Sequence, residues 1–399
     1  MSNGKIVIKP NREKPILNQH PWIFSGAIDE VRGNPSPGDI VTVMDKSGKF
    51  LARGYWNPKS QIQVRILTWQ DEEINDDWWR RMLKRAIDAR QINAMSPAAS
   101  RRLVNAENDF IPGLIVDQYA DWLVLQALTL GIDRRKEMLA ATLMELSQPQ
   151  GIFERSDVDV RKKEGLPQHT GTLLGNEPPE LIEIEEGSRI LVDVHRGHKT
   201  GYYLDQAVNR AELYHLISTH SLRNASFLNL FSYTGGFGLS ALKAGASTVV
   251  NVDSSREILE LAEKNFELNA SNPGEAEFIQ ANAFDYLHDI AEQGEQFDIV
   301  ICDPPKFAQN AQQVERAARG YKDLNLNCFK IIKSGGYLMT FSCSGAVSAD
   351  LFQKIVFGAL ADSGRQAQIL RHLGPSDDHP VALTFPEGAY LKGLLLRVY

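Results

Sequence analysis

The stretch Ser226-Phe-Leu-Asn-Leu-Phe-Ser-Tyr-Thr-Gly-Gly-Phe-Gly238 decides the fold class of this chain. Its first residues form an apolar run typical of a buried strand, and the glycines that follow indicate a loop leading into a helix. More strand candidates follow, with helix candidates between them, at residues 248–253, 277–281, 297–303 and 336–342. This alternation predicts an α/β fold with a parallel, doubly wound sheet.

Residues 1–72 are predicted to form a small β-barrel. Short alternating or β-branched segments are separated by turn residues, and the strand candidates are 5–8, 39–43 and 61–67. The first 70 residues carry ten Lys or Arg against five Asp or Glu, a net charge of +5, whereas the whole chain has a net charge of -7. This asymmetry favours contact between the N-terminal module and a polyanion such as RNA, although a solvated basic face would give the same pattern.

Aromatic side chains lie among the cations of this first module, as in His20-Pro-Trp-Ile-Phe24 and Arg53-Gly-Tyr-Trp56. Such mixtures can stack on bases and hold phosphates, so Lys14, Trp22 and Arg53 are candidate RNA contacts. Most of the aromatic residues are nevertheless expected to fill the interior of the barrel.

Two further modules are expected after the barrel. Residues 73–186 are predicted to be an α+β module, with helices and a hairpin at 77–94, 134–146 and 113–128. Residues 187–399 are predicted to be a Rossmann-like domain that starts with a strand candidate at 190–194 and a helix at 205–218.

The composition limits the class of protein. Hydrophobic content of 43% and charged content of 23% are ordinary for a globular protein, and no apolar run approaches the length of a membrane helix. The N-terminus has no apolar segment of the kind that signal peptides need. The three cysteines have no metal-ligand spacing, so neither a zinc site nor a disulfide framework is expected, and a cytoplasmic location is predicted.

Polar and glycine residues follow the predicted strands at the points where they end. The loop from Asn229 to Gly238 lets a ligand approach the backbone, and Asp253 ends the second strand 24 positions after Asn229. A carboxylate there can accept both ribose hydroxyls of a nucleoside. The glycine loop alone is a weak signal, since nicotinamide and flavin folds use similar loops.

The most specific motif is Asp303-Pro304-Pro305-Lys306-Phe307, at the end of the fourth strand. Two prolines after an acid fix an extended turn without backbone donors, which can hold polar groups against a planar base. A purely structural Pro-Pro turn is the alternative interpretation.

Cys343 ends the fifth strand and is expected to lie beside the Asp303 turn, since the fourth and fifth strands are neighbours in this topology. A thiolate that adds to C6 of a pyrimidine makes C5 nucleophilic enough to accept a methyl group. Asp303 suits the second requirement, a group that stabilises N3 as charge develops there. Cys302 is expected to point into the core, and Cys328 to pack within an apolar helix.

The chain resembles the bacterial large-subunit rRNA cytosine-C5 methyltransferase I family over nearly its whole length. The shared motifs are His198-Lys-Thr-Gly-Tyr-Tyr-Leu-Asp-Gln206, Phe231-Ser-Tyr-Thr-Gly-Gly-Phe237, Asp303-Pro-Pro-Lys-Phe307, Phe341-Ser-Cys-Ser-Gly345, Asp378-His-Pro380 and Tyr390-Leu-Lys-Gly393. The resemblance implies a PUA domain, a central α+β domain and a Rossmann-like methyltransferase domain. It implies formation of 5-methylcytosine in 23S rRNA, with the large ribosomal subunit or its precursor as partner, and it allows a homodimer.

The resemblance also implies residue roles. Cys343 would be the nucleophile and Asp303 its catalytic partner, with no metal. The S-adenosylmethionine site would be lined by Gln206, Asn229, Phe231, Ser232, Tyr233, Thr234, Gly235, Asp253, Asn282 and Asp303. Lys306, Pro304 and Pro305 would face the RNA.

Three departures from wider methyltransferase patterns stand out. Ser232-Tyr233 occupies a place where many methyltransferases have glycine, and Asn282 stands where an acid is common. Broader RNA cytosine-C5 enzymes carry a second cysteine, which helps release product, where this chain has Lys306. Lys306 can pair with an RNA phosphate or with the base, or it can be an ordinary surface lysine.

Three other functions compete with cytosine-C5 methylation. Asp-Pro-Pro followed by an aromatic residue is typical of amine methylation on a purine, but here the aromatic Phe307 comes one position late. An RNA-binding or ribosome-assembly factor that holds S-adenosylmethionine without catalysis is the second. A nicotinamide oxidoreductase is disfavoured, because the glycine pattern is wrong and Asp-Pro-Pro has no role in hydride transfer.

Overall fold

The computed structural model describes residues 4–91, 100–219, 222–271 and 274–399, which form two compact units. Unit 1 comprises Met1–Ile184, Val192–Leu204 and Asp377–Gly388, and unit 2 comprises Glu185–Leu191, Asp205–Ser376 and Ala389–Tyr399. This division differs from the three predicted modules, because unit 1 joins the first two and takes two segments from residues 187–399. Those two segments belong to unit 1 because of their contacts with residues distant in sequence. Local sequence patterns do not encode such contacts.

The N-terminal part of unit 1 is a six-stranded sheet in the order β2-β6-β5-β4-β1-β3. Its elements are β1 (Lys5–Ile8), α1 (Lys14–Leu17), β2 (Trp22–Phe24), β3 (Ile28–Arg32), β4 (Ile40–Met44), β5 (Phe50–Trp56) and β6 (Ile62–Thr68). The strands predicted at 5–8, 39–43 and 61–67 correspond to β1, β4 and β6. Their alternating side chains, such as Val41 and Val43, are buried in a common core, which is why these segments form strands.

A five-stranded sheet in the order β11-β10-β9-β8-β7 follows within unit 1. Its elements are α2 (Asp76–Gln91), β7 (Arg101–Asn105), β8 (Leu114–Tyr119), β9 (Trp122–Ala127), α3 (Leu130–Asp133), α4 (Lys136–Ser147), β10 (Gly151–Ser156), α5 (Val160–Glu164) and β11 (His169–Gly175). The predicted hairpin is confirmed as the antiparallel pair β8 and β9. Residues 92–94 of the predicted helix 77–94 lie outside the described residues.

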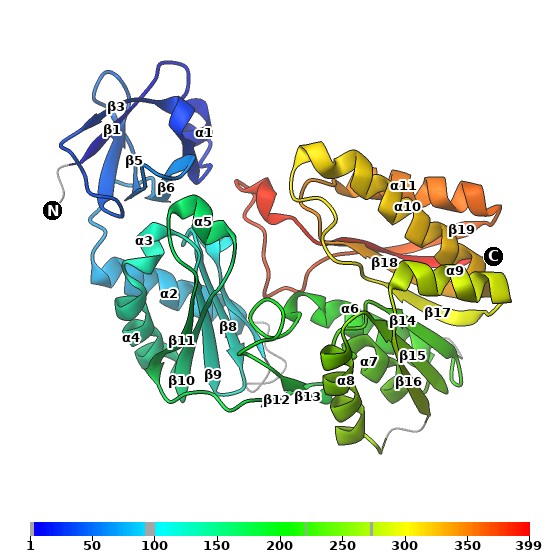
Figure 1. Ribbon diagram of the computed structural model, residues 1–399. Coiled ribbons are helices and arrows are strands. Elements are labelled where there is room, and N and C mark those ends of the chain that lie inside the picture. The colour runs from blue at the N-terminus through cyan, green and yellow to red at the C-terminus, as the bar shows by residue number, and fades with distance from the viewer. Residues whose placement is uncertain (1–3, 92–99, 220–221, 272–273) are drawn as a thin grey trace. The chain divides into compact units, whose positions relative to one another are not determined.

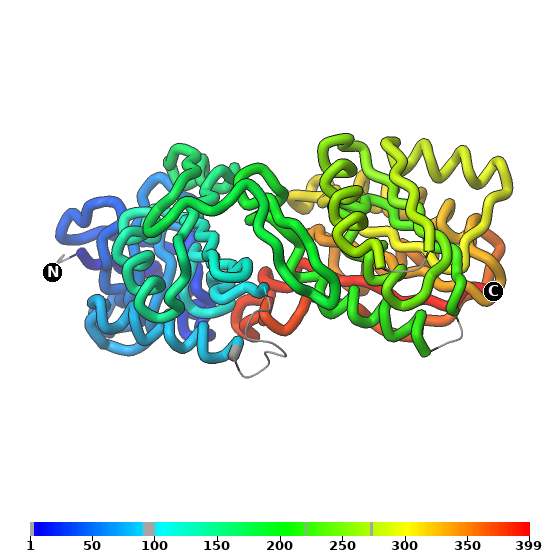
Figure 2. Tube along the Cα trace, turned by 90° about the horizontal axis from the view of Figure 1, so that it is seen from below, coloured from blue at the N-terminus to red at the C-terminus, as the bar shows by residue number. Residues whose placement is uncertain are grey.

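Residues from the C-terminal part of the chain complete unit 1. The backbone N–H of Arg102 donates to Asp378 Oδ2 at 2.7 Å, and Asn105 Nδ2 donates to Pro380 O at 3.0 Å. Figure 2 shows this segment, drawn in red, beside the cyan trace of the second sheet. The Asp378-His379-Pro380 motif therefore has a packing role in unit 1.

Unit 2 contains a seven-stranded sheet in the order β16-β15-β14-β17-β18-β20-β19. Its strands are β14 (Ser226–Leu230), β15 (Thr248–Asp253), β16 (Glu275–Gln280), β17 (Phe297–Cys302), β18 (Ile332–Ser342), β19 (Ala367–Leu373) and β20 (Lys392–Val398). The first five are parallel, and β20 is antiparallel to both of its neighbours. The predicted doubly wound α/β fold is confirmed, and the antiparallel last hairpin distinguishes it from the usual dinucleotide-binding order 3-2-1-4-5-6.

Helices cover both faces of this sheet (Figure 1). Side chains of α9 (Ala283–Gln293), α10 (Val314–Ile331) and α11 (Ala349–Ser363) pack on one face, and those of α6 (Ala207–Thr219), α7 (Gly236–Ala244) and α8 (Arg256–Leu268) on the other. The strand candidate at 190–194 is not part of this sheet, because β13 (Ser188–Val192) forms a two-stranded sheet with β12 (Ile182–Glu186). Among the described residues, every helix is too short or too polar to span a membrane.

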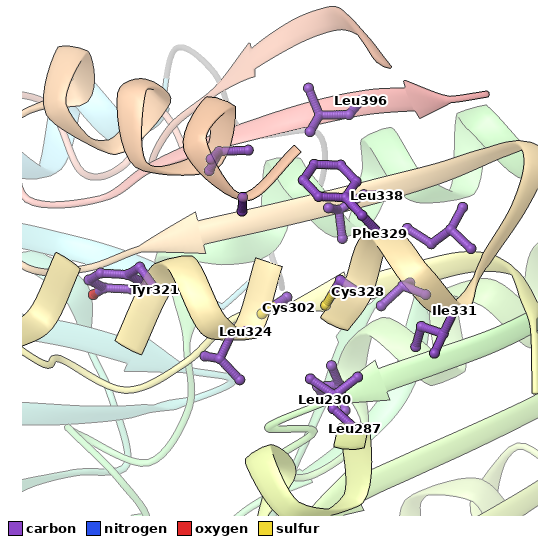
Figure 3. Close-up of a cluster of buried hydrophobic side chains, with 14 of the residues drawn as sticks. Leu230, Leu287, Cys302, Tyr321, Leu324, Cys328, Phe329, Ile331, Leu338 and Leu396 are labelled. Carbon is purple, nitrogen blue, oxygen red and sulfur yellow. The ribbon is translucent and has the colours of Figure 1, made fainter. Parts of the chain in front are cut away.

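Two of the three cysteines belong to the apolar core on the α10 side of the sheet, as predicted. Cys302 and Cys328 are fully buried beside Leu230, Leu324 and Phe329 (Figure 3). Burial raises the pKa of the Cys328 thiol well above its usual value, so this thiol stays protonated. Cys343 alone among the three is only partly buried, which leaves it as the candidate nucleophile.

Candidate active site

The candidate site lies at the carboxyl edge of the parallel strands of unit 2. Leu230 is paired with Val252 on one side and with Cys302 on the other, and Cys302 is paired with Thr340. The loops that follow β14, β15, β17 and β18 therefore leave the sheet at the same edge, as ligand sites in open α/β sheets do.

The loop after β14 has an unusual backbone. Phe231 and Tyr233 have φ of 57° and 48°, and Gly235 has φ of 82°. A left-handed conformation costs a non-glycine residue about 1–2 kcal/mol, so this geometry persists only because surrounding contacts hold it. One such contact is the Tyr233 N–H, which donates to Asp253 Oδ2 at 3.0 Å. Where many methyltransferases have glycine, this chain has Ser232-Tyr233, and Tyr233 adopts a strained left-handed backbone conformation.

Three side chains around this loop fit the polar groups of S-adenosylmethionine. Ser232 Oγ and Thr234 Oγ1 are buried and have no hydrogen-bond partner among the described residues. Buried hydroxyls without partners cost free energy, and a ligand carboxylate or ammonium would satisfy them. Asp253 accepts N–H groups at both oxygens, from Tyr233 and from Ser255 at 3.1 Å, which fixes the orientation of its carboxylate. Its contact with the ribose hydroxyls stays a prediction.

The other predicted cofactor residues are held by neighbours. Asn229 Nδ2 donates to Asn251 Oδ1 at 3.0 Å inside the sheet, and Asn282 Oδ1 caps α9 by accepting the Phe284 N–H at 2.9 Å. Gln206 accepts from Asn209 Nδ2 at 2.5 Å and donates to Asp303 Oδ2 at 2.8 Å. Gln206 and Asp303 are thus in direct contact. The side chain of Asn282 is suited to its position because asparagine is a favoured N-cap residue of a helix.

Replacing Asp253 with alanine is expected to weaken S-adenosylmethionine binding by about 10- to 100-fold, because hydrogen bonds to a charged group contribute about 1.5–3 kcal/mol. Isothermal titration calorimetry on the folded protein measures this change. Glu257→Ala is the matched control, since Glu257 is an exposed acid in the first turn of α8. If the two variants bound S-adenosylmethionine with equal affinity, Asp253 would not be a cofactor-binding residue.

The loops after β17 and β18 are joined by buried polar contacts. The Cys343 thiol lies 3.9 Å from Pro304 O, which confirms the predicted proximity of the two loops. Ser344 Oγ accepts the Ala308 N–H at 3.1 Å and lies 3.0 Å from the Tyr321 hydroxyl, which also accepts from Ser342 Oγ at 2.9 Å. These bonds fix Cys343 relative to the Asp-Pro-Pro turn.

Sequence reasoning missed the residues that make this connection. Tyr321, Ser342 and Ser344 are fully buried, and burial raises the pKa of Tyr321, so its hydroxyl stays protonated. A tyrosine on the apolar face of a helix and serines on both sides of a strand-end cysteine are weak signals by themselves. Only the packing of α10 against the strand ends brings them together.

Pro304 is buried, while Pro305 and Lys306 are exposed. The next residue, Phe307, packs against Tyr321 with ring centroids 4.7 Å apart. The aromatic side chain of this motif is therefore partly buried against the core, and Lys306 remains a predicted RNA contact.

The three N-terminal candidates for RNA contact have different surroundings. Lys14 is exposed on α1, and Arg53 pairs with Asp71 and lies over the Phe50 ring at 5.9 Å. Trp22 donates its indole N–H to Glu107 at 2.8 Å, and its ring lies 4.8 Å from that of Phe385. These partners lie outside the barrel, so Trp22 does not fill the barrel interior, and its contact with RNA stays a prediction.

Comparison with known proteins defines the class. Family models for a PUA-like domain and for an S-adenosylmethionine-dependent methyltransferase match residues 6–69 and 109–397. SMU.776, a candidate methyltransferase solved in complex with SAH, shares the fold with a TM-score of 0.84 and 22% identity over 98% of this chain and 99% of that chain. The fold and the site therefore define an S-adenosylmethionine-dependent methyltransferase.

Ribosomal RNA large subunit methyltransferase I of Tolumonas auensis is 46% identical over 98% of both chains, and that of Escherichia coli is 43% identical over 99% of both. The chain belongs to the ribosomal RNA large subunit methyltransferase I family.

Proposed function

We propose that this protein transfers a methyl group from S-adenosylmethionine to C5 of a cytosine in 23S rRNA, through a covalent bond between Cys343 and C6 of the base. The observation that carries the proposal is the position of the Cys343 thiol, 3.9 Å from the backbone of the Asp303-Pro304-Pro305 turn. The names of the relatives supply rRNA as the substrate class. Cytosine-C5 chemistry rests on the cysteine and on the family resemblance.

The side chains of this site suit the steps of C5 methylation. The Cys343 thiolate forms a bond to C6, and the electrons of the C5–C6 double bond move toward C4 and N3. Asp303, which accepts a hydrogen bond from Gln206 Nε2, is proposed to stabilise N3 through a proton or hydrogen bond.

When bound, S-adenosylmethionine supplies an electrophilic methyl group. The loop after β14 and Asp253 would hold the cofactor, and its sulfonium would release the methyl group to C5. The C5 proton then leaves to a base, the C6–S bond breaks, and Cys343 regains its thiolate. The target base must be unstacked to enter such a site.

Methylation of a purine nitrogen is the alternative. It needs no thiol, and it commonly uses an aromatic side chain close after Asp-Pro-Pro to hold the base. Here Phe307 packs against Tyr321 instead. This placement favours the cytosine reaction.

The basic N-terminal module is proposed to hold the rRNA, with Lys14 and Arg53 as contacts and a cytoplasmic large subunit or its precursor as the partner. Phosphate contacts of this kind fix register without reading sequence.

Nucleoside mass spectrometry tests the proposed reaction. A strain lacking the gene is expected to lose one 5-methylcytosine from 23S rRNA, and the purified protein is expected to restore it to protein-free RNA. Fragment mapping of the same RNA locates the nucleotide. Loss of a methylated purine with all 5-methylcytosine retained would support the alternative.

A further inference from the structure

We propose that Lys392 is a positioning residue that holds the Cys343 loop in place and supplies a buried cation favouring the Cys343 thiolate. The inference rests on the proposed function, because it assigns Lys392 to the nucleophile of that reaction. It also gives a role to Lys392 within the Tyr390-Leu391-Lys392-Gly393 motif.

Lys392 is in contact with the loop that carries Cys343. It is the first residue of β20 and is paired with Ser342, the last residue of β18. Its side chain is 8% exposed, and its Nζ donates to Ser344 O and to Val347 O, both at 2.7 Å. Burying an ammonium group costs free energy unless hydrogen bonds or a charged partner compensate it.

The two carbonyls belong to the tight turn that follows Cys343. The Val347 N–H donates to Ser344 O at 3.0 Å, so Ser344 O accepts from the turn and from Lys392 together. The ammonium group therefore holds the turn through these two carbonyls. Tyr321 contacts the two serines that flank Cys343. Cys343 lies between these two supports.

The charges around Lys392 indicate what the ammonium does. Burial lowers the pKa of Lys392 to about 8, the charge of Cys343 opposes this shift, and that of Lys306 adds to it. Below pH 8 the amine is thus mainly protonated. Because the interaction between two charges is mutual, a Lys392 cation favours the Cys343 thiolate as much as the thiolate favours the cation.

Three substitutions separate the charge from the hydrogen bonds. Lys392→Arg keeps the charge and the donors, Lys392→Gln keeps an amide donor without charge, and Lys392→Met keeps neither. Lys354→Met is the matched control, since Lys354 is an exposed lysine of α11 that pairs with Asp350 at 2.7 Å. Circular dichroism and S-adenosylmethionine titration establish that each variant is folded.

The readout is the rate of Cys343 alkylation by iodoacetamide between pH 6 and 10, followed by mass spectrometry of its peptide without RNA. The other two cysteines are fully buried and report unfolding. Gln and Met at position 392 are expected to shift the profile upward by about one pH unit, making alkylation at pH 7 about tenfold slower. Below pH 8, where Lys392 is mainly protonated, the Arg variant and the Lys354 control are expected to follow the wild-type profile.

A wild-type profile in folded Gln and Met variants would overturn the proposal. If the Arg variant does not fold, the comparison of Gln with the wild type decides. If the Met variant alone does not fold, the comparison of Gln with Arg decides. Alkylation is measured without RNA, so it tests the link between Lys392 and Cys343 independently of the proposed reaction. If the alkylation rate depended on Lys392 but methyl transfer did not need Cys343, the proposed reaction would be rejected and the link between the two residues would stand.

Discussion

Cys343→Ala is expected to lower methyl transfer to 23S rRNA by about 10³-fold or more, with S-adenosylmethionine affinity unchanged. Without the thiolate, C5 of cytosine is too weak a nucleophile to take the methyl group. Affinity is expected to be retained because most of the proposed cofactor groups belong to the loop after β14 and to Asp253, and β17 separates these strands from β18. Transfer of a labelled methyl group to protein-free rRNA measures the loss.

Cys328→Ala is the control for this substitution. Cys328 is fully buried in α10, so its truncation is expected to lower stability while the folded fraction keeps its turnover. RNA carrying 5-fluorocytosine adds an independent readout, since fluorine at C5 cannot leave as a cation and the C6–S bond persists. A covalent protein–RNA complex is expected with the wild type and none with Cys343→Ala. Normal turnover by the alanine variant would end the C5 hypothesis.

Asp303→Asn is expected to reduce kcat by about 10²- to 10³-fold, the usual effect of losing one group that stabilises developing charge. The amide can still accept from Gln206 Nε2, so the turn is expected to keep its shape. What the variant loses is the carboxyl group that can meet N3 of the base as charge develops there. Single-turnover kinetics separate this step from product release.

Asp298→Asn provides a matched control on the same strand. Asp298 lies near the opposite end of β17, where it accepts from Ser226 and pairs with Lys333 at 2.9 Å. Its pKa is lowered because the hydrogen bonds and charge at that site outweigh its burial. This substitution is expected to reduce stability without changing kcat. If both variants lost kcat equally, Asp303 would have a structural role only.

The doubly wound sheet of unit 2 could be predicted because its signal is local. Apolar runs such as residues 226–230 and 297–302 are strands buried on both faces, and turn or helix patterns separate them. Parallel strands place their carboxyl ends at one edge, so Asp253, Asp303 and Cys343 could be assigned to a common edge without coordinates. The contact between the Cys343 and Pro304 loops followed from the same rule.

Other features depended on partners distant in sequence. Trp22 is a candidate stacking residue by its sequence context, whereas its contacts with Glu107 and Phe385 could not be predicted from that context. Residues 192–204 and 377–388 appeared to continue the Rossmann-like domain, but they belong to unit 1. Periodicity reports which face of an element is buried, and it carries no information about which distant segment covers that face.

By itself, the sequence determined the α/β class, the residues at the strand ends and the choice of Cys343 over Cys302 and Cys328, since each follows from local patterning and the pleat of a strand. Only the tertiary structure decided that Phe231 and Tyr233 take left-handed conformations, and that Tyr321 and Lys392 support the Cys343 loop. The reason is physical. Strain and buried polar contacts are sustained by the packing of several elements together, and no single segment of the chain specifies them.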